Sequence, residues 1–199
     1  MVNNTSNFRK AFEEKIKKTN KVNLLILENF KVINKIINLM YRKIKSKNKF
    51  YLCGNGGSAS DAQHVATEFM VRFDKKYNRY GIPAICMNTD PTLITACSND
   101  FHFNDIFKRQ FETLANKNDL LICFSTSGNS KNIIEVLKSA KKKKITSICF
   151  LGNPGGRAKN FSDISLIIPE KNTALIQEAH MLVAHFIIEQ IEIKILANK

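Results

Sequence analysis

FYLCGNGGSASD at residues 50–61 and LLICFSTSGNS at residues 120–130 have one organisation: an apolar run, a loop of small polar residues, and the start of a helical pattern. Short apolar runs without strict alternation are typical of strands that are buried on both faces of a parallel sheet. Glycine, serine and asparagine directly after such a run favour a tight turn. The two stretches therefore predict strand, loop and helix units of an α/β protein.

The same alternation continues along the rest of the chain. Further strands are predicted at residues 82–87, 145–151 and 164–168, and helices at 58–71, 91–98, 103–116, 130–142 and 173–197. Alternating strands and helices indicate a parallel sheet with right-handed crossovers and helices on both faces. We therefore expect a five-stranded, doubly wound parallel sheet flanked by helices.

The first 48 residues have a helical pattern. Between residues 8 and 45, apolar side chains recur largely at spacings of three and four, which predicts one long amphipathic helix or two in series. The apolar stripe from Leu24 to Ile44 is wide, so it needs a partner surface on the body of the domain or on another subunit. We expect an N-terminal helical arm over residues 1–48, followed by one α/β domain over residues 49–199.

Length and composition are those of one globular unit. The 199 residues are 44% hydrophobic and 24% charged, which excludes disorder as the main character. No run reaches the roughly 18 apolar residues of a membrane span, and the start of the chain has no apolar core of a secretory signal. We therefore expect a cytoplasmic protein with no membrane partner. Five cysteines without CxxC spacing indicate neither a disulfide framework nor a cysteine zinc site, and we expect them to be small buried side chains.

The net charge is +14, from 31 Lys and Arg residues against 17 Asp and Glu residues. Such a balance is compatible with an anionic partner. Many of the cations, however, fall in two clusters, at residues 42–49 and 141–144, where helices are expected to end. Cations in the last turn complement the helix dipole. We interpret these clusters as solvated helix ends and expect no nucleic acid partner.

Two loops at strand ends have the composition of anion sites, and in open α/β sheets ligands bind beyond the carboxyl ends of the strands. The loop of residues 54–61 is rich in glycine and opens a helix, whose free N–H groups attract anions. It matches a loose dinucleotide pattern, but the acidic residue expected about 20 positions further on is not evident. The loop of residues 125–130 offers four hydroxyl groups, which suit a phosphate; a polar turn with a helix cap is the alternative.

Two predicted helices carry side chains with catalytic or metal-binding chemistry. His64 and Glu68 lie four positions apart and share one helix face, which permits joint metal ligation or a common catalytic pocket. An exposed helix pair is the alternative. Gln177, His180 and His185 fall on the last helix. Each of the two histidines there is also compatible with a half-buried structural side chain.

Several motifs follow one another in order along the chain. They are CGNGGS at 53–58, DAQH at 61–64 with Glu68, SNDF at 98–101, FNDIF at 103–107, STSGNS at 125–130, and IQE at 176–178 with His180 and His185. From about residue 8 to its end, the chain resembles the phosphoheptose isomerases of the sugar-isomerase (SIS) superfamily. The resemblance implies a flavodoxin-like sheet and a homotetramer with active sites at subunit interfaces. It also implies conversion of sedoheptulose 7-phosphate to D-glycero-D-manno-heptose 7-phosphate for bacterial surface polysaccharides.

The resemblance also assigns roles to individual residues. It implies that the phosphate is held by Ser58, Ser125, Thr126, Ser127 and Ser130. It implies contacts to the sugar from Asn55, Gly56, Gly57, Arg72, Thr89, Asp100 and Gln177. It implies that Glu68 is the base, that His185 is its catalytic partner, and that zinc is bound by His64, Glu68, Gln177 and His185. Because Gln177 and His185 are about 12 Å apart along a straight helix, they can share one ion only if their side chains lean together.

Two other functions stay open from the sequence. A non-catalytic SIS protein that binds the bacterial replication initiator would use the same fold as a platform, although it has no need for the four implied zinc ligands together. An SIS enzyme of another phosphosugar is the second alternative, because the serine loop recognises the phosphate and not the length of the sugar. Leu175 and Val71 stand where relatives commonly have arginine and glycine, which bears on substrate preference and not on the reaction class.

Overall fold

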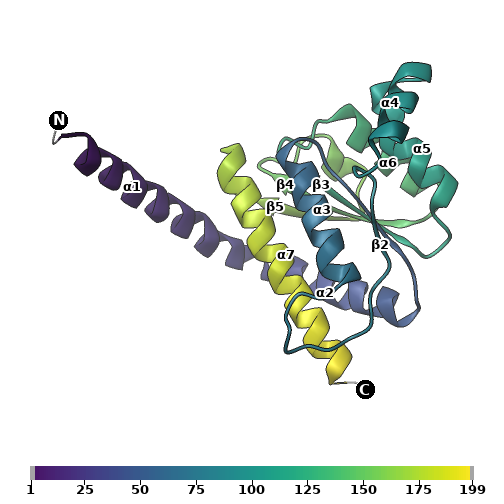
Figure 1. Ribbon diagram of the computed structural model, residues 1–199, viewed down its shortest axis with the longest axis horizontal. Helices are drawn as coiled ribbons and strands as arrows, with labels where there is room; N and C mark the ends of the chain where they lie inside the picture. Colours follow the sequence, from purple (N-terminus) through teal and green to yellow (C-terminus); the bar gives the residue numbers. More distant parts are fainter. Residues whose placement is uncertain (1–2, 198–199) are drawn as a thin grey trace.

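The computed structural model describes residues 3–197, and its centre is a parallel sheet with the strand order β2-β1-β3-β4-β5 (Figure 1). The strands are β1 (Phe50–Cys53), β2 (Ala84–Cys86), β3 (Leu120–Ser125), β4 (Thr146–Gly152) and β5 (Ile164–Ile168). The α-helices are α1 (Asn3–Leu25), α2 (Phe30–Lys45), α3 (Gly57–Met70), α4 (Pro91–Asp100), α5 (Ile106–Leu114), α6 (Lys131–Lys142) and α7 (Thr173–Leu196). Short 3₁₀ helices are η1 (Ile26–Asn29), η2 (Phe103–Asp105) and η3 (Ala158–Asn160). The predicted five-stranded parallel sheet flanked by helices is confirmed.

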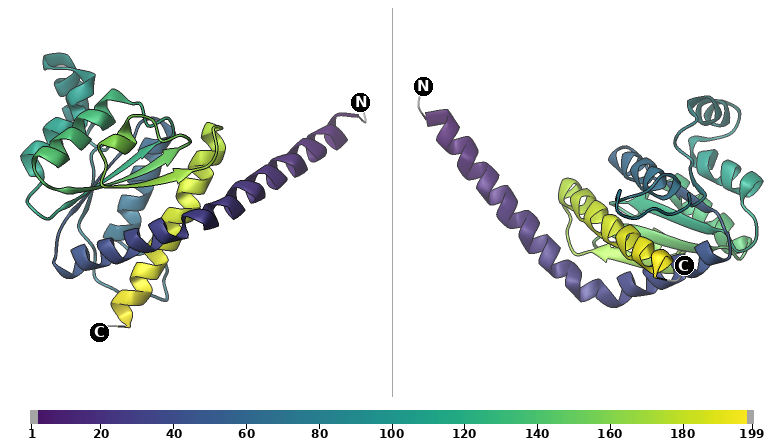
Figure 2. Two further views of the ribbon diagram at one scale, coloured as in Figure 1. Left: turned by 180° about the vertical axis from the view of Figure 1, so that it is seen from behind. Right: turned by 60° about the horizontal axis from the view of Figure 1, so that its bottom comes forward.

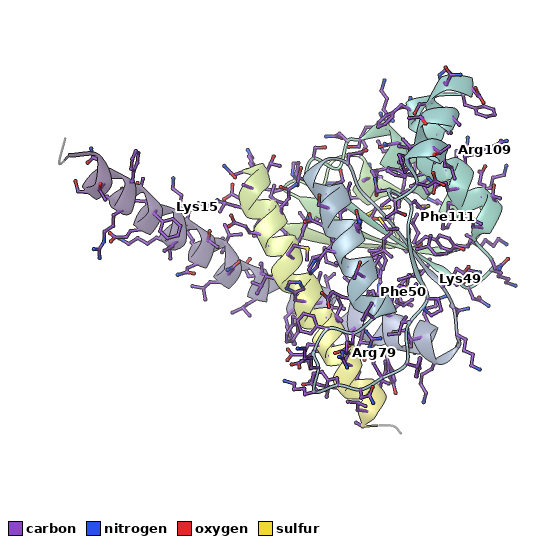
Figure 3. The ribbon with its side chains drawn as sticks, viewed as in Figure 1. Lys15, Lys49, Phe50, Arg79, Arg109 and Phe111 are labelled. Carbon is purple, nitrogen blue, oxygen red and sulfur yellow. The ribbon has the colours of Figure 1, made fainter. Side chains whose placement is uncertain are left out.

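Helices cover both faces of the sheet, as the views in Figure 2 show. α2, α3 and α7 pack on one face and α5 and α6 on the other, so two separate apolar clusters form. Phe50 belongs to the first cluster and Phe111 to the second (Figure 3). Every residue of β1 and β3 is buried, as expected for strands covered on both faces. No helix within residues 3–197 combines the length and the hydropathy that crossing a lipid bilayer requires.

The two N-terminal helices differ in what they contact. α2 packs against α7 and β5, and its apolar side chains from Ile33 onward belong to the core. α1 projects away from the body (Figures 1 and 2) and leaves Phe8 and Phe12 67% and 66% exposed. Nζ of Lys15 lies 2.9 Å from Oε1 of Glu178 and joins α1 to α7. Two helices in series are thus confirmed, and the body of the domain covers the second of them.

Several elements differ from their predicted bounds by one or two residues, and β2 and the helix predicted over residues 103–116 differ in ways that the chain explains or that change the element. β2 starts at Ala84 instead of residue 82, because Pro83 has no N–H for a strand ladder; its carbonyl still accepts from the N–H of Phe50 at 2.9 Å. The helix predicted over residues 103–116 is divided into η2 and α5 and ends at Leu114. Residues 71–83, between α3 and β2, form a loop without regular structure.

The five cysteines are free and buried, as the sequence predicts. Sγ of Cys53 lies 3.6 Å from Sγ of Cys123 on the neighbouring strand. Burial raises the pKa of the Cys123 and Cys149 thiols well above the ordinary value. These thiols are therefore packing groups of the second apolar cluster.

Candidate active site

The loops that follow β1 and β3 lie side by side, because these strands pair in parallel with Cys53 opposite Cys123. α3 and α6 begin directly after the two loops, so the amino ends of both helices come to one edge of the sheet. The loops enclose a small cavity of about 50 Å³, which is lined by Asn55, Ser58, Phe124, Ser125, Thr126, Ser127 and Ser130. The structure thus gathers all five hydroxyl residues for which a phosphate contact is predicted.

Hydrogen bonds within the chain shape the serine loop around this cavity. The N–H of Gly128 donates to Oγ of Ser125 at 3.1 Å. Gly128 has a φ of +63°, which favours glycine, and a Cβ there would collide with the carbonyl of Gly155. The side-chain amides of Asn55 and Asn132 exchange two hydrogen bonds of 2.9 Å, which tie the loop after β1 to the start of α6.

The start of α6 offers backbone hydrogen-bond donors to an anion, although the N–H of Ile133 already donates to Oδ1 of Asn132 at 2.9 Å. Ser130 is the N-cap of α6, but its hydroxyl makes no capping hydrogen bond. The side chain of Asn172, by contrast, caps α7 by accepting from two backbone N–H groups. The first N–H groups of a helix have no intrahelical partner and lie at the positive end of the helix dipole. A phosphate in the cavity would accept from these groups and from the serine hydroxyls.

A second group of polar side chains lies where α3 and α7 pack together. Nε2 of His64 lies 3.0 Å from Nε2 of His185 and 3.4 Å from Oε1 of Glu68. The side chain of His64 is 49% exposed and that of Glu68 is 19% exposed. Burial, and then the nearby His64, lowers the pKa of His185, while Glu68 acts in the opposite direction. His64 and Glu68 share one helix face, as predicted, and meet His185 from the last helix.

Gln177 does not join this second group within one chain. Its amide lies against Gly57 at the start of α3, so close that a Cβ on Gly57 would collide with it. His185 comes two turns later in α7, about 12 Å along the axis. Within residues 3–197, no three His, Cys, Asp or Glu side chains already converge into a metal site. The four implied zinc ligands are therefore not gathered in a single chain, because the rise of α7 separates Gln177 from His185.

Known proteins with the same sequence pattern and fold decide which family this is. Residues 12–152 match the family model of the SIS domain. A phosphoheptose isomerase of Sulfurimonas denitrificans is 40% identical over 193 residues, which cover 96% of this chain and 98% of that protein. The chain belongs to the phosphoheptose isomerases of the SIS family. The solved phosphoheptose isomerase of Francisella tularensis has a TM-score of 0.87 and 29% identity, with 92% of this chain and 97% of that chain covered. That of Neisseria gonorrhoeae has a TM-score of 0.85 and 30% identity, with 92% and 98% covered.

The remaining predicted sugar contacts of this isomerase are spread over segments next to α3, β2 and α4. Gly56, with a φ of +57°, lines a shallow hollow beside the phosphate cavity. Thr89 follows β2, and its hydroxyl donates to the carbonyl of Cys86 at 2.9 Å. Arg72 and Asp100 are exposed, just after α3 and at the end of α4. Within the described part of the chain, no hydrogen bond or ion pair joins these two residues to the cavity or to His64 and its neighbours.

Asp61 and His180 carry no predicted role, yet Asp61 is half-buried and His180 is fully buried in this isomerase. Burial raises the pKa of Asp61 to about 6, and its Oδ2 has no hydrogen-bond partner. The ring of His180 packs against Phe124 and Phe150, with centroids 6.0 and 5.8 Å away. Burial lowers the pKa of His180 to about 4 despite an opposing effect of the Leu151 backbone, so the ring is neutral at pH 7. Sequence reasoning missed both residues. For Asp61, helical spacing was an available signal, because Asp61 follows Gly57 by four residues and therefore lies on the same helix face as the glycine-rich loop.

Ser127→Ala should weaken binding of a sugar phosphate. The exposed Ser127 hydroxyl borders the cavity, and a hydrogen bond to a charged group contributes about 1.5–3 kcal/mol. We expect KM to rise about tenfold or more in steady-state kinetics. Thr113→Ala removes an exposed hydroxyl from α5 and is the matched control. An unchanged KM in Ser127→Ala would remove this side chain from the phosphate site.

Proposed function

We propose that this isomerase converts D-sedoheptulose 7-phosphate to D-glycero-D-manno-heptose 7-phosphate in the cytoplasm, for the heptoses of bacterial surface polysaccharides. The observation that carries the proposal is the cluster of His64, Glu68 and His185 in a chain that also has a hydroxyl-rich anion cavity. A carboxylate and an imidazole are the groups that a ketose–aldose isomerisation needs. The similarity to proteins named phosphoheptose isomerase supports the choice of a seven-carbon substrate.

The reaction moves one hydrogen between neighbouring carbon atoms of the open-chain sugar. A base takes the proton from C1 of the ketose, an enediolate forms, and the base returns a proton to C2. Over these two steps O2 gains a proton and O1 loses one, so the sugar gains and loses no atom. Glu68 is the base in this proposal. His185 moves the oxygen-bound proton, because its lowered pKa keeps the ring neutral at pH 7, with one nitrogen that donates and one that accepts.

The proposal includes a zinc ion, which would supply a Lewis acid for the sugar oxygens. His64, Glu68 and His185 would hold it after their side chains turn toward a common point, since they do not already converge on one within the described residues. Imidazole nitrogen and carboxylate oxygen are ordinary zinc ligands. Two ligand atoms about 2.1 Å from a tetrahedral zinc lie roughly 3.4 Å apart, and the separations from His64 to His185 and to Glu68 are 3.0 and 3.4 Å. Gln177 would complete the set from another subunit. A carboxylate that binds zinc tightly is a weaker base, and a zinc-bound imidazole has lost its accepting nitrogen, so the two roles of Glu68 and of His185 compete.

A homotetramer with active sites between subunits completes the proposal. Ser58 and Glu68 are ten residues apart in α3, which places the cavity and the histidine cluster of one chain about 15 Å apart along the helix. This separation supports sites that combine the cavity of one subunit with the cluster of another. Apolar side chains available for assembly are exposed at Phe8, Phe12, Ile16, Leu24, Leu27, Phe30, Leu182 and Phe186. The last four of these residues, from Leu27 onward, also line a hollow of about 200 Å³ between η1, α2 and α7.

Glu68→Gln should abolish turnover, because an amide cannot accept the proton from C1. The assay follows loss of sedoheptulose 7-phosphate and appearance of an aldoheptose phosphate by NMR. We expect kcat to fall by at least a thousandfold, in the range of a lost general base, with the assembly unchanged in light scattering. Glu135→Gln, on α6, is the control. Near-normal turnover in Glu68→Gln would rule out this carboxylate as the base, and no turnover in the natural protein would refute the proposed substrate.

The zinc proposal predicts the metal content of the purified protein. We expect about one zinc per subunit by elemental mass spectrometry, and loss of most of it in His64→Ala and in His185→Ala. His102→Ala removes a histidine that lies outside the cluster and should leave the zinc content unchanged. Equal zinc in all four proteins would contradict the assignment of these ligands.

Assembly through the arm is tested by substitutions, since α2 belongs to the core and its deletion would unfold the domain. The triple change Phe8→Ser, Phe12→Ser and Ile16→Ser removes exposed apolar side chains from α1. We expect a species smaller than four times the chain mass of 22.6 kDa in light scattering. Arg9→Ala with Glu13→Ala, which removes an exposed ion pair of α1, is the control. A tetramer that survives the triple change would show that α1 is not an assembly surface.

A further inference from the structure

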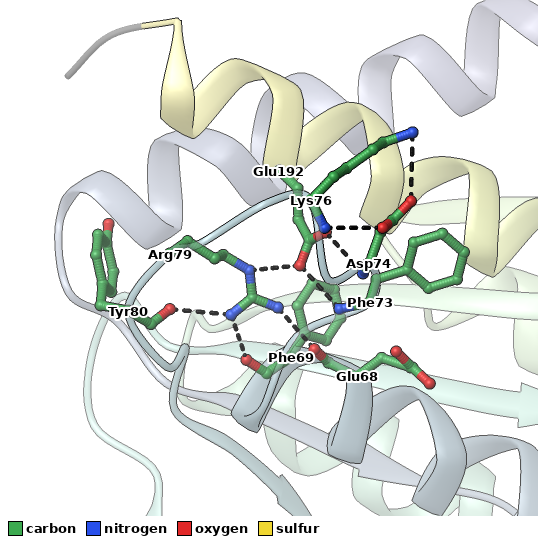
Figure 4. A network of polar contacts seen from close by, with 8 residues as sticks. All are labelled: Glu68, Phe69, Phe73, Asp74, Lys76, Arg79, Tyr80 and Glu192. Atoms are coloured by element: carbon green, nitrogen blue, oxygen red, sulfur yellow. Dashed lines mark hydrogen bonds and ion pairs between the residues drawn. The ribbon is translucent and has the colours of Figure 1, made fainter.

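Two fully buried charges lie beneath the α3/α7 contact (Figure 4). Nε of Arg79 donates to Oε1 of Glu192 at 2.7 Å, and both side chains are 0% exposed. Arg79 lies in the loop of residues 71–83 and Glu192 in the last two turns of α7. No sequence motif marks either residue, and neither lies in the phosphate cavity or in the cluster of His64, Glu68 and His185.

The remaining donors of Arg79 hold the end of α3. Nη2 donates to the backbone carbonyl of Glu68 at 2.6 Å, and Nη1 donates to the carbonyls of Phe69 and Tyr80 at 2.9 Å each. The last carbonyls of a helix have no intrahelical partner and need such donors when they are buried. Arg79 therefore caps the last turn of α3, which contains the proposed base and ends at Met70.

Glu192 holds the other side of the same contact. Its carboxylate accepts from the N–H groups of Phe73 and Asp74 at 2.9 and 3.3 Å. The ring of Phe73 packs against the ring of His185, with the centroids 5.3 Å apart. Glu192 follows His185 by seven residues, two turns of α7, so both lie on one helix face. Glu192 thereby fixes the loop residue that supports the imidazole.

A buried ion pair is seldom the most stable choice for a protein interior, since well-packed apolar side chains in its place are often as stable or more so. Its directional hydrogen bonds, in contrast, define positions. Here Arg79 donates to the backbone carbonyl of Glu68, and Glu192 accepts from the N–H of Phe73, whose ring packs against His185. We propose that Arg79 and Glu192 form a positioning pair, which sets Glu68 and His185 relative to each other across α3 and α7. This inference rests on the roles proposed above for Glu68 and His185.

The test separates positioning from stability. Arg79→Met and Glu192→Leu each leave one buried charge unpaired and should lower the thermal midpoint. The double variant Arg79→Met/Glu192→Leu removes both charges, so we expect its thermal midpoint to rise above that of either single variant, although the backbone groups that these side chains held lose their partners. We expect its kcat to stay at least tenfold low and its KM to change less than twofold, because the phosphate cavity lies at the other end of α3. If kcat recovers together with the thermal midpoint, the pair is structural and the proposal is overturned.

Asp119→Asn is the matched control, because it perturbs a buried carboxylate that pairs with Lys49 before β1 and touches neither α3 nor α7. It should lower the thermal midpoint and leave kcat unchanged below the unfolding range. Phe73→Leu keeps both charges and removes the ring from His185, so it should lower kcat by several-fold with KM unchanged. A full kcat in Phe73→Leu would show that Phe73 does not position His185, and it would overturn this part of the proposal even if the double variant does not fold.

A readout that needs no substrate keeps this test distinct from that of the proposed function. The ring of Phe73 shifts the NMR signals of the His185 ring, which are assigned as the signals lost in His185→Gln. We expect these signals to move in the double variant in the same direction as in Phe73→Leu, and to stay in place in Asp119→Asn. Unmoved signals in the double variant would refute the positioning role. Moved signals without turnover in the natural protein would refute the proposed substrate and not the positioning pair.

Discussion

Parallel pairing between β1 and β3 is the constraint on which the phosphate cavity depends. The register that places Cys53 opposite Cys123 ends both strands at one level, so the loops after them meet. Each of these two strands is followed by a crossover helix, α3 after β1 and α6 after β3. The amino ends of both helices therefore come to the same edge. A phosphate at that edge, as proposed, would meet backbone N–H groups, hydroxyl groups and two helix dipoles at once. A slip of one residue between these strands would displace the Asn55 and Asn132 amides that hold the loops together.

α3 connects the two parts of the proposed active site. Its amino end begins beside the phosphate cavity, and its carboxyl half carries His64 and Glu68 against His185 of α7. A helix is stiff over this length, so the distance between the two ends is a fixed property of one chain. The proposal of shared sites follows from this stiffness, since a neighbouring subunit can present the other half of the site. Because of the same stiffness, contacts of the buried pair Arg79 and Glu192 at the end of α3 would also fix the position of Glu68, the proposed base.

The sheet, its loops and the shared face of His64 and Glu68 were predictable, because each depends on local spacing along the chain. The hydroxyl side chains around the phosphate cavity were predictable for the same reason, since four of the five fall in one loop. The direction of α1 was not, because helical periodicity shows an apolar face but not what covers it. The ion pair of Arg79 and Glu192 joins residues 113 positions apart, and no local pattern encodes such a partner. The place of Gln177 beside Gly57 depends likewise on how α3 and α7 pack.

The five buried thiols have a consequence for how this isomerase meets oxidants and alkylating reagents. Only a thiolate attacks such reagents, and burial holds Cys123 and Cys149 in the protonated form. Cys53 and Cys123 on β1 and β3 come into reach only when the sheet itself opens. Their rate of labelling therefore measures how often the strands beneath the site separate. Packing therefore protects these thiols in the folded chain, and a reagent labels them only in molecules whose sheet has opened.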